Sequence, residues 1–220
     1  VYLCGDTFNS REVAVKVVFE DRLDQSDQGR LTRKLFITEA SLTGKLNHPH
    51  IVQIYDAVVG NDISYIVMEY VPGGTLEQYC SKESLLAIDK VVEIIFKCTR
   101  ALDFANRLGV THRDIKPANI LVSGETDIKI SDFGAALMAS VDQTQVAGIG
   151  SPAYMSPQQI KEHPLNQQTD IYSLGVVMFQ LLTGQLPFQA SNNYSMMYQI
   201  TNVEPPLASS LRKDIPLAVD

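Results

Sequence analysis

Hydrophobic positions in the first part of the chain are grouped in short stretches between polar turn signals, a pattern typical of β-strands. Residues 1–4 and 12–18 are rich in residues typical of β-strands and flank G-D-T-F-N-S, which predicts a hairpin turning near Asn9 and Ser10. Two further strands, at 51–58 and 63–70, flank a G-N-D turn. Apolar residues at 31, 35, 42 and 46 have roughly helical spacing, and N-H-P at 47–49 ends that segment. We therefore predict a small sheet that carries one helix.

The pattern becomes mainly helical after V-P-G-G at 71–74. Residues 85–108 predict a long helix closed by Gly109, and 171–182 are apolar nearly all round, which predicts a helix buried on every side. Short strands are expected at 119–122 and 127–130, and a loop leading into a helix at 202–220. The prediction is a β-rich lobe (1–70), a hinge (71–74) and a mainly helical lobe (75–220). The residues sharing one side of the long helix are Ile88, Val91, Val92, Ile95, Leu102, Ala105 and Leu108.

The bulk composition narrows the class of protein. The chain has 220 residues, 45% of them hydrophobic, which suits one large domain or two lobes sharing a cleft. A net charge of −7 argues against a nucleic-acid partner. Three cysteines without paired spacing indicate reduced, partly buried thiols and no zinc site. The longest apolar stretch, 174–182, is too short to cross a bilayer, and the chain does not open on a signal peptide. We expect a cytoplasmic domain, with any membrane anchor outside this chain.

Three oxygen-bearing side chains lie at the ends of the predicted short strands. Asp114 and Asn119 are on a segment too irregular for a helix, and Asp132 follows the next strand in S-D-F-G. Carboxylate and amide oxygens suit Mg²⁺ and not Zn²⁺. Each of these residues alone is more often a turn-former, but the three together, with Lys116 between them, favour a cation site. Lys116 would either neutralise the carboxylates or bind an anion.

Lys16 stands in the middle of an otherwise apolar strand. A buried ammonium group needs a carboxylate partner, and Glu39 on the core-facing side of the 31–46 helix is the candidate. The alternative is a lysine at a strand edge whose charged end reaches solvent. A Lys16–Glu39 pair facing a cleft would hold phosphates from one side while a metal held them from the other.

Six short motifs occur along the chain in the order and with the spacing of a known family: V-A-V-K (13–16), T-E-A (38–40), V-M-E-Y (67–70), H-R-D-I-K-P-A-N (112–119), D-F-G (132–134) and D-I-Y-S-L-G-V (170–176). Together they resemble a eukaryotic-type protein kinase domain, similar to the serine/threonine kinases of bacteria. The resemblance implies an α+β, bilobal protein kinase fold. It also implies an ATP-dependent protein serine/threonine kinase that uses Mg²⁺, with Mn²⁺ as an alternative metal.

The same resemblance implies roles for individual residues. Asp114 would accept or orient the proton of the substrate hydroxyl, Lys116 would contact the γ-phosphate, and Asn119 and Asp132 would bind the metal. Met68 would lie at the back of the adenine pocket, and an apolar column of His112, Phe133 and Ile54 would align the lobes, with Thr43 as a weak point. The residues implied for nucleotide binding are Val1, Ala14, Lys16, Glu39, Met68, Glu69, Val71, Leu121 and Asp132, where Glu69 and Val71 act through their backbones and Val1, Ala14 and Leu121 enclose the ring.

The chain departs from the family pattern in two places. Val1 stands where the valine after the glycine-rich loop belongs, so we expect that loop to lie outside this chain. S-P-Q replaces A-P-E at 156–158, so Gln158 stands where a glutamate pairs with a distant arginine. By the same resemblance, Arg113 before Asp114 implies control by phosphorylation of the segment after Asp132. Thr144 is the candidate for that modification, and Ser151 is interpreted as structural.

Three functions are compatible with these residues. The preferred one is an active kinase acting on serine and threonine hydroxyls of proteins, with self-association for autophosphorylation. The alternative is a signalling pseudokinase that binds a nucleotide or a partner without catalysis, against which the set of polar residues argues. A small-molecule kinase of the same fold is disfavoured because of Lys116 and the segment around 156–158.

Overall fold

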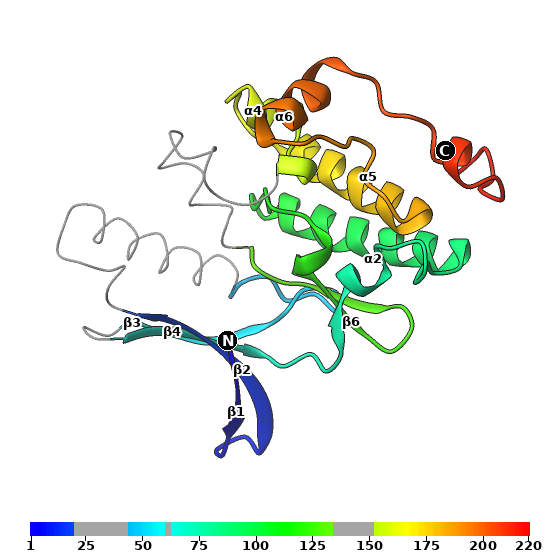
Figure 1. Ribbon diagram of the computed structural model, residues 1–220. Coiled ribbons are helices and arrows are strands. Elements are labelled where there is room, and N and C mark those ends of the chain that lie inside the picture. Colours follow the sequence, from blue (N-terminus) through cyan, green and yellow to red (C-terminus); the bar gives the residue numbers. More distant parts are fainter. Residues whose placement is uncertain (20–43, 60–62, 134–151) are drawn as a thin grey trace.

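The computed structural model describes residues 1–19, 44–59, 63–133 and 152–220, in an α+β architecture of a sheet-rich part and a helical part (Figure 1). Four residues singled out in the sequence, Glu39, Thr43, Thr144 and Ser151, lie outside the described residues. None of the helices in the described ranges is both long and apolar enough to cross a membrane.

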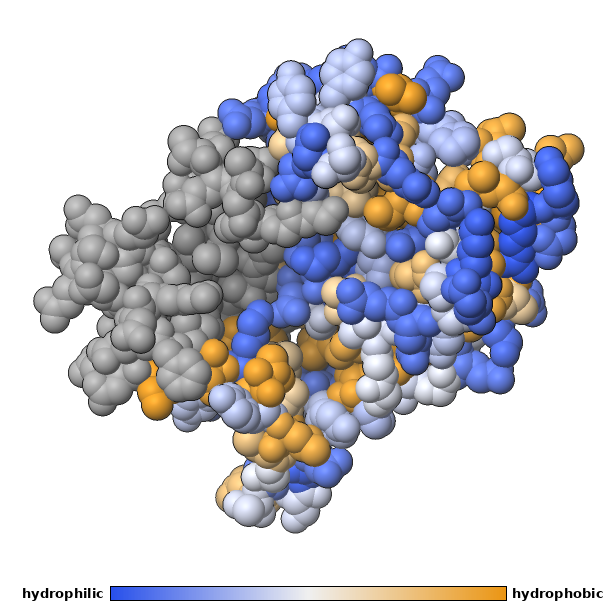
Figure 2. All heavy atoms as spheres, in the orientation of Figure 1, coloured by the Kyte–Doolittle hydropathy of each residue, from blue (hydrophilic) through white to orange (hydrophobic). Residues whose placement is uncertain are grey.

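A four-stranded antiparallel sheet forms the first part. Its strands are β1 (Tyr2–Asp6), β2 (Arg11–Phe19), β3 (Ile54–Val59) and β4 (Ile63–Glu69), in the order β1-β2-β4-β3. The predicted hairpin and strand pair are confirmed, but the third strand begins later than residue 51. Ile51 instead forms an isolated parallel bridge to Ile130 in the second part, so this segment joins the two parts. Figure 2 shows apolar surface along the β1–β2 hairpin, where Tyr2 and Leu3 are exposed.

A second, three-stranded sheet packs against the helical part, with β5 (Gly74–Thr75), β6 (Ile120–Ser123) and β7 (Asp127–Ile130) in that order. The end of the predicted 71–74 hinge is therefore the start of a strand that pairs with β6. Gly73 has φ +121, and a Cβ there would lie 2.2 Å from the Val122 carbonyl oxygen. Only glycine fits at this approach of the connecting segment to β6.

In the described ranges the helices are α2 (Ile88–Arg107), α4 (Pro157–Ile160), α5 (Gln167–Thr183), α6 (Asn193–Asn202) and α7 (Ala208–Leu211), with 3₁₀ turns at Leu76–Tyr79, Pro117–Asn119 and Pro152–Tyr154. The expectation that α5 is buried on every side is wrong on one side, because Ile171 is 62% exposed. The sequence did not predict α6.

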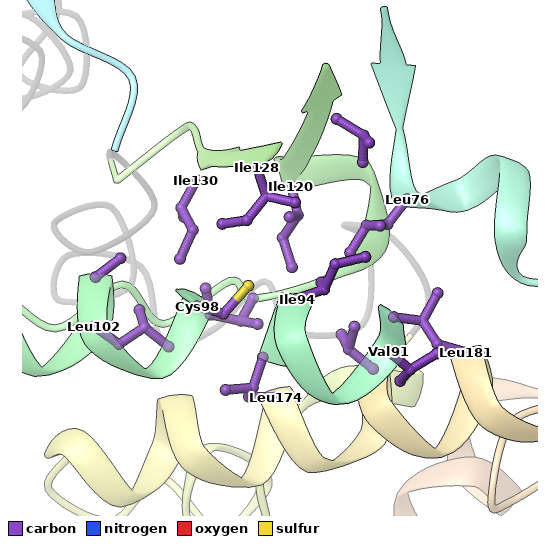
Figure 3. Packing of buried hydrophobic residues seen from close by; sticks show 14 of the residues in the cluster. Leu76, Val91, Ile94, Cys98, Leu102, Ile120, Ile128, Ile130, Leu174 and Leu181 are labelled. Atoms are coloured by element: carbon purple, nitrogen blue, oxygen red, sulfur yellow. The ribbon is translucent and has the colours of Figure 1, made fainter. Parts of the chain in front are cut away.

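The core lies between α5, α2 and the second sheet (Figure 3). Ile94 and Cys98 of α2 are fully buried, and Ile128 and Ile130 of β7 lie above them while Leu174 of α5 lies below. Burial of each such side chain contributes about 1.5–3 kcal/mol. This core holds the loops at the ends of β6 and β7, which carry the polar residues of the candidate site.

Candidate active site

The first sheet and the end of β7 approach each other through an ion pair. Lys16 on β2 places its Nζ 2.5 Å from Oδ1 of Asp132, which follows β7. The two side chains are 38% and 44% exposed, so both can be reached from solvent. Asp132 has φ +58, in the left-handed region that non-glycine residues rarely adopt. The structure thus brings together two side chains that are 116 residues apart in the sequence.

A small, mainly apolar cavity of about 20 Å³ adjoins this ion pair. That volume has room for about one water molecule. Met68, predicted at the back of the adenine pocket, lines the cavity and lies opposite Ala14 in the register of β2 and β4. The lining residues are Lys16, Val52, Ile54, Ile66, Met68, Ile130, Ser131, Asp132 and Phe133.

A single 3₁₀ turn, Pro117–Asn119, brings Asn119 back onto Asp114. The Asn119 amide Nδ2 donates to the Asp114 carbonyl at 2.8 Å and to its carboxylate Oδ2 at 3.0 Å. Lys116 Nζ lies 2.8 Å from the same Oδ2. The other oxygen, Oδ1, accepts no hydrogen bond within the described part of the chain, and the Asp114 side chain is 39% exposed. One oxygen of this carboxylate is held in place and the other can meet a ligand.

Asn119 and Asp132 are joined through the intervening Ser131. The Ser131 amide donates to the Asn119 carbonyl at 2.9 Å, and its hydroxyl donates to the same oxygen at 3.2 Å. Because Nδ2 of Asn119 is engaged, its amide oxygen is the atom left for a ligand. Asp132 Oδ2 likewise accepts no hydrogen bond from the residues that the structure describes. One amide and one carboxylate oxygen fit Mg²⁺, which commonly keeps several waters.

Asp170, in the first turn of α5, holds the backbone that precedes Asp114. Its carboxylate accepts from the amides of His112 at 2.8 Å and Arg113 at 2.7 Å, and its side chain is buried. Burial raises the pKa of the Asp170 carboxyl, opposed by the nearby His112 and by these two hydrogen bonds. The sequence reasoning missed this role. The available signal was an aspartate at the start of an apolar helix, which needs partners when buried.

His112 is fully buried and links the two loops. Its Nδ1 accepts from the Asp114 amide at 3.2 Å, so the ring proton is on Nε2, which lies 2.8 Å from the Ser131 carbonyl. Its ring centroid lies 4.6 Å from that of Phe133. The predicted contact of these two rings is confirmed, and Ile54 lines the same cavity as Phe133.

The remaining residues implied for nucleotide binding are on the strands around the connection. The Glu69 amide donates to the Gln53 carbonyl at 2.8 Å, so the backbone group of Glu69 that is left for a base edge is its carbonyl, which would accept a hydrogen bond. The Glu69 carboxylate forms an ion pair with Lys129 of β7 at 3.0 Å, a link between the two sheets that the sequence reasoning missed. Leu121 and Val71 are half-buried, whereas Val1 is 80% exposed.

The segment around α4 contacts the backbone of residue 113 through Gln159 and not through Gln158. Gln159 Nε2 donates to the Arg113 carbonyl at 2.8 Å, while its Oε1 accepts from the Ser156 amide at 2.9 Å. The Nε of Arg113 is buried and has no hydrogen-bond partner in the described part of the chain. Residue 113 is thus contacted from both α4 and α5.

Known proteins that resemble this chain show its family. The protein kinase domain family matches residues 1–216. Serine/threonine-protein kinase PrkC of Bacillus subtilis (strain 168) is 37% identical over 222 residues, covering 100% of this chain and 34% of the relative. A probable serine/threonine-protein kinase PknB of Lactococcus lactis is 37% identical over 224 residues, covering 100% and 35%. Serine/threonine-protein kinase PknB of Mycobacterium leprae is 36% identical over 228 residues, covering 100% and 36%. The chain spans about one third of the length of these relatives, and it belongs to the protein kinase domain family.

Proposed function

We propose that this chain is the catalytic domain of a protein kinase that transfers the γ-phosphoryl group of ATP to serine and threonine hydroxyls of proteins. The observation that carries the proposal is the different environment of the two carboxylate oxygens of Asp114. One of its carboxylate oxygens is held by Lys116 and Asn119, while the other is available to a ligand. The names of the relatives, all serine/threonine-protein kinases, support the choice of acceptor.

In this proposal Asp114 is the catalytic residue for the acceptor. Its Oδ1 takes the hydrogen bond, and then the proton, of the substrate hydroxyl. The hydroxyl oxygen forms a bond to the γ-phosphorus as the bond from phosphorus to the β–γ bridging oxygen breaks, which gives a phosphoprotein and ADP. Lys116 lies 2.8 Å from the Asp114 carboxylate, so its ammonium group is close to where charge develops on the transferred group. Placement of charges accounts for most catalysis of this kind.

Asn119 and Asp132 are the residues that we propose to hold Mg²⁺, with Mn²⁺ as an alternative. The metal, when bound, would neutralise phosphate charge and orient the γ-phosphoryl group. Lys16 would bind phosphate oxygens from the side of the first sheet, and its present contact with Asp132 supports this position. The proposed contacts of the base are the Glu69 and Val71 backbones, with Val1, Ala14, Met68 and Leu121 around the ring. The pairing of Lys16 with Glu39 stays a prediction.

The alternative of a pseudokinase is not favoured: Lys116 and Asn119 contact Asp114, and Lys16 contacts Asp132, which supports the presence of the polar groups that phosphoryl transfer needs. We propose protein substrates as partners. Self-association for autophosphorylation, a cytoplasmic location and modification of Thr144 stay predictions.

Phosphate transfer from labelled ATP to a generic basic protein tests the proposal, with the full-length protein and Mg²⁺. We expect phosphoserine or phosphothreonine in the product and its loss in Asp114→Asn and Asp132→Asn. Asp103→Asn is the matched control, because Asp103 is half-exposed on α2 and contacts Arg107. Magnesium-dependent ATP binding by the unaltered protein without any phosphate transfer would refute the proposal and favour the pseudokinase.

A further inference from the structure

The peptide unit between Arg113 and Asp114 is held at both of its polar ends. Its carbonyl, from Arg113, accepts from Nε2 of Gln159 at 2.8 Å. Its N–H, from Asp114, donates to Nδ1 of His112 at 3.2 Å. Because a peptide unit is planar, fixing both groups fixes the orientation of the plane. That plane sets the direction in which the Asp114 side chain leaves the backbone.

Gln159 is itself held so that its amide can have only one orientation. The side-chain Oε1 of Gln159 accepts from the backbone amide of Ser156 at 2.9 Å. In return, the Ser156 hydroxyl accepts from the backbone amide of Gln159 at 3.2 Å. This reciprocal pair is a capping box at the start of α4. With Oε1 directed at Ser156, the Nε2 group is directed at the Arg113 carbonyl. The same side chain therefore caps one helix and binds the loop of Asp114.

We propose that Gln159 is a positioning residue that orients Asp114 from α4 through the Arg113 carbonyl. The inference rests on the proposed function, since it assigns Gln159 an effect on the rate of phosphoryl transfer. Backbone conformation adds to the argument. Arg113 has φ +68, a conformation that a non-glycine residue keeps only where contacts hold it.

The substitution Gln159→Glu tests the positioning of Asp114 separately from the capping of α4. Glutamate is as suitable as glutamine in a capping box, because either side chain can accept from the Ser156 amide. An ionised glutamate has no donor for the Arg113 carbonyl and places an oxygen against it. Methionine at 159 has a similar length and removes both hydrogen bonds without adding charge. Gln168→Glu is the matched control for charge, because Gln168 is exposed in the first turn of α5.

We expect Gln159→Glu to lower kcat for protein phosphorylation about tenfold, the effect of one lost hydrogen bond, with KM for ATP within about twofold of the unaltered protein. Its urea unfolding midpoint should fall by less than about 0.5 M, because one hydrogen bond is lost while the capping bond to Ser156 is kept, so the variant stays folded in the assay. Gln168→Glu should change neither kcat nor the midpoint. Gln159→Met should lower kcat at least as much and lower the midpoint further, because it also loses the capping bond.

Two results separate failure of the inference from failure of the proposed function. An unaltered protein that transfers no phosphate refutes the proposed function. An active unaltered protein together with a Gln159→Glu variant of equal kcat overturns the positioning role and leaves Gln159 as a helix cap only. The positioning role is equally overturned if kcat of Gln159→Glu falls only in proportion to a loss of folded protein.

Discussion

Outside the proposed reacting groups, Asp170→Asn is the substitution for which the structure predicts the largest effect. The carboxylate accepts two amide hydrogen bonds, from His112 and Arg113, in a site where its side chain is only 5% exposed. Asparagine has one oxygen and one NH₂ group at these positions. The oxygen can keep one amide, while the NH₂ group faces the other amide, donor against donor.

The size of the effect follows from these two bonds. A hydrogen bond to a charged group contributes about 1.5–3 kcal/mol, and a buried amide left without a partner costs about 1–3 kcal/mol. Loss of the buried charge offsets part of this, because burial disfavours the ionised carboxyl and raises its pKa. We therefore expect the free energy of unfolding to fall by about 2 kcal/mol. With an m-value of about 2–3 kcal/mol/M in urea, the unfolding midpoint falls by roughly 1 M.

Urea unfolding followed by circular dichroism measures this change, and phosphate transfer is measured on the same samples without urea. A typical domain has about 5–15 kcal/mol of stability, so the variant should stay folded while its kcat falls more than about tenfold. Asp103→Asn is the control, since its exposed ion pair with Arg107 is worth about 0.5 kcal/mol or less. A midpoint for Asp170→Asn equal to that of Asp103→Asn would refute the reasoning.

Three further predictions concern stability and reactivity away from the site. Burial, and then the nearby His50, Arg100 and Lys129, lower the pKa of His48, so the folded state keeps the neutral ring. The contribution of His48 to stability is complete above the pKa of the unfolded chain, about 6.5, and is lost as the pH falls below it. The urea unfolding midpoint should therefore be lower at pH 5.5 than at pH 7.5, and this difference should be smaller in His48→Asn. Cys4 is exposed, whereas burial raises the pKa of Cys98 to about 12. A thiol reagent at pH 8 should label Cys4 in the folded protein and Cys98 only in urea, as mass spectrometry would show; equal native rates would contradict the burial of Cys98. Gly175 is exposed within α5 with nothing near its missing Cβ, so Gly175→Ala should raise the free energy of unfolding by about 0.5–1 kcal/mol. Gly184→Ala should lower the free energy of unfolding by more than about 1 kcal/mol, because φ is +73 and the Cβ would lie 2.6 Å from the backbone nitrogen of Lys82. Calorimetry of both variants measures the two changes, and a change of the same sign in both would contradict the argument.

Strands and long helices were predictable because burial on one face leaves a periodic signal. The boundaries were less so, as α2 shows. It begins at Ile88, while the apolar pattern starts at Leu85, because Leu86 packs against the core from outside the helix. Burial does not stop where helical hydrogen bonds stop.

Helix α6 was missed because its apolar residues are on more than one face. Met196 and Ile200 are buried, but Tyr194 and Tyr198 are 82% and 59% exposed, which hides the amphipathic pattern. A start signal was present in the sequence. Asn192 caps the helix by accepting from the Ser195 amide, and asparagine before a helical segment is a typical N-cap.

The proposed reacting groups of the candidate site were predictable as residue types, but the contacts that hold them were not. Asp114 and Asn119 precede β6 and Asp132 follows β7, so all three lie in one short region of the sequence, and oxygen-bearing side chains of this kind predict a cation site directly. Asp170 and Gln159 act on the backbone at positions 57 and 46 residues away, respectively, and such long-range bonds leave no local pattern.

The backbone at Arg113 explains why two separate segments are needed to hold it. A non-glycine residue at φ +68 costs about 1–3 kcal/mol, and nothing at position 113 in the sequence reveals this strain. Two amide bonds to the Asp170 carboxylate contribute about 1.5–3 kcal/mol each, enough to hold the strained residue. They act on the amides of residues 112 and 113, however, and not on the following peptide unit, whose N–H donates to His112 Nδ1. The bond from Gln159 to the Arg113 carbonyl holds the other end of that unit, so α5 supports the strain while His112 and α4 together set the direction of Asp114.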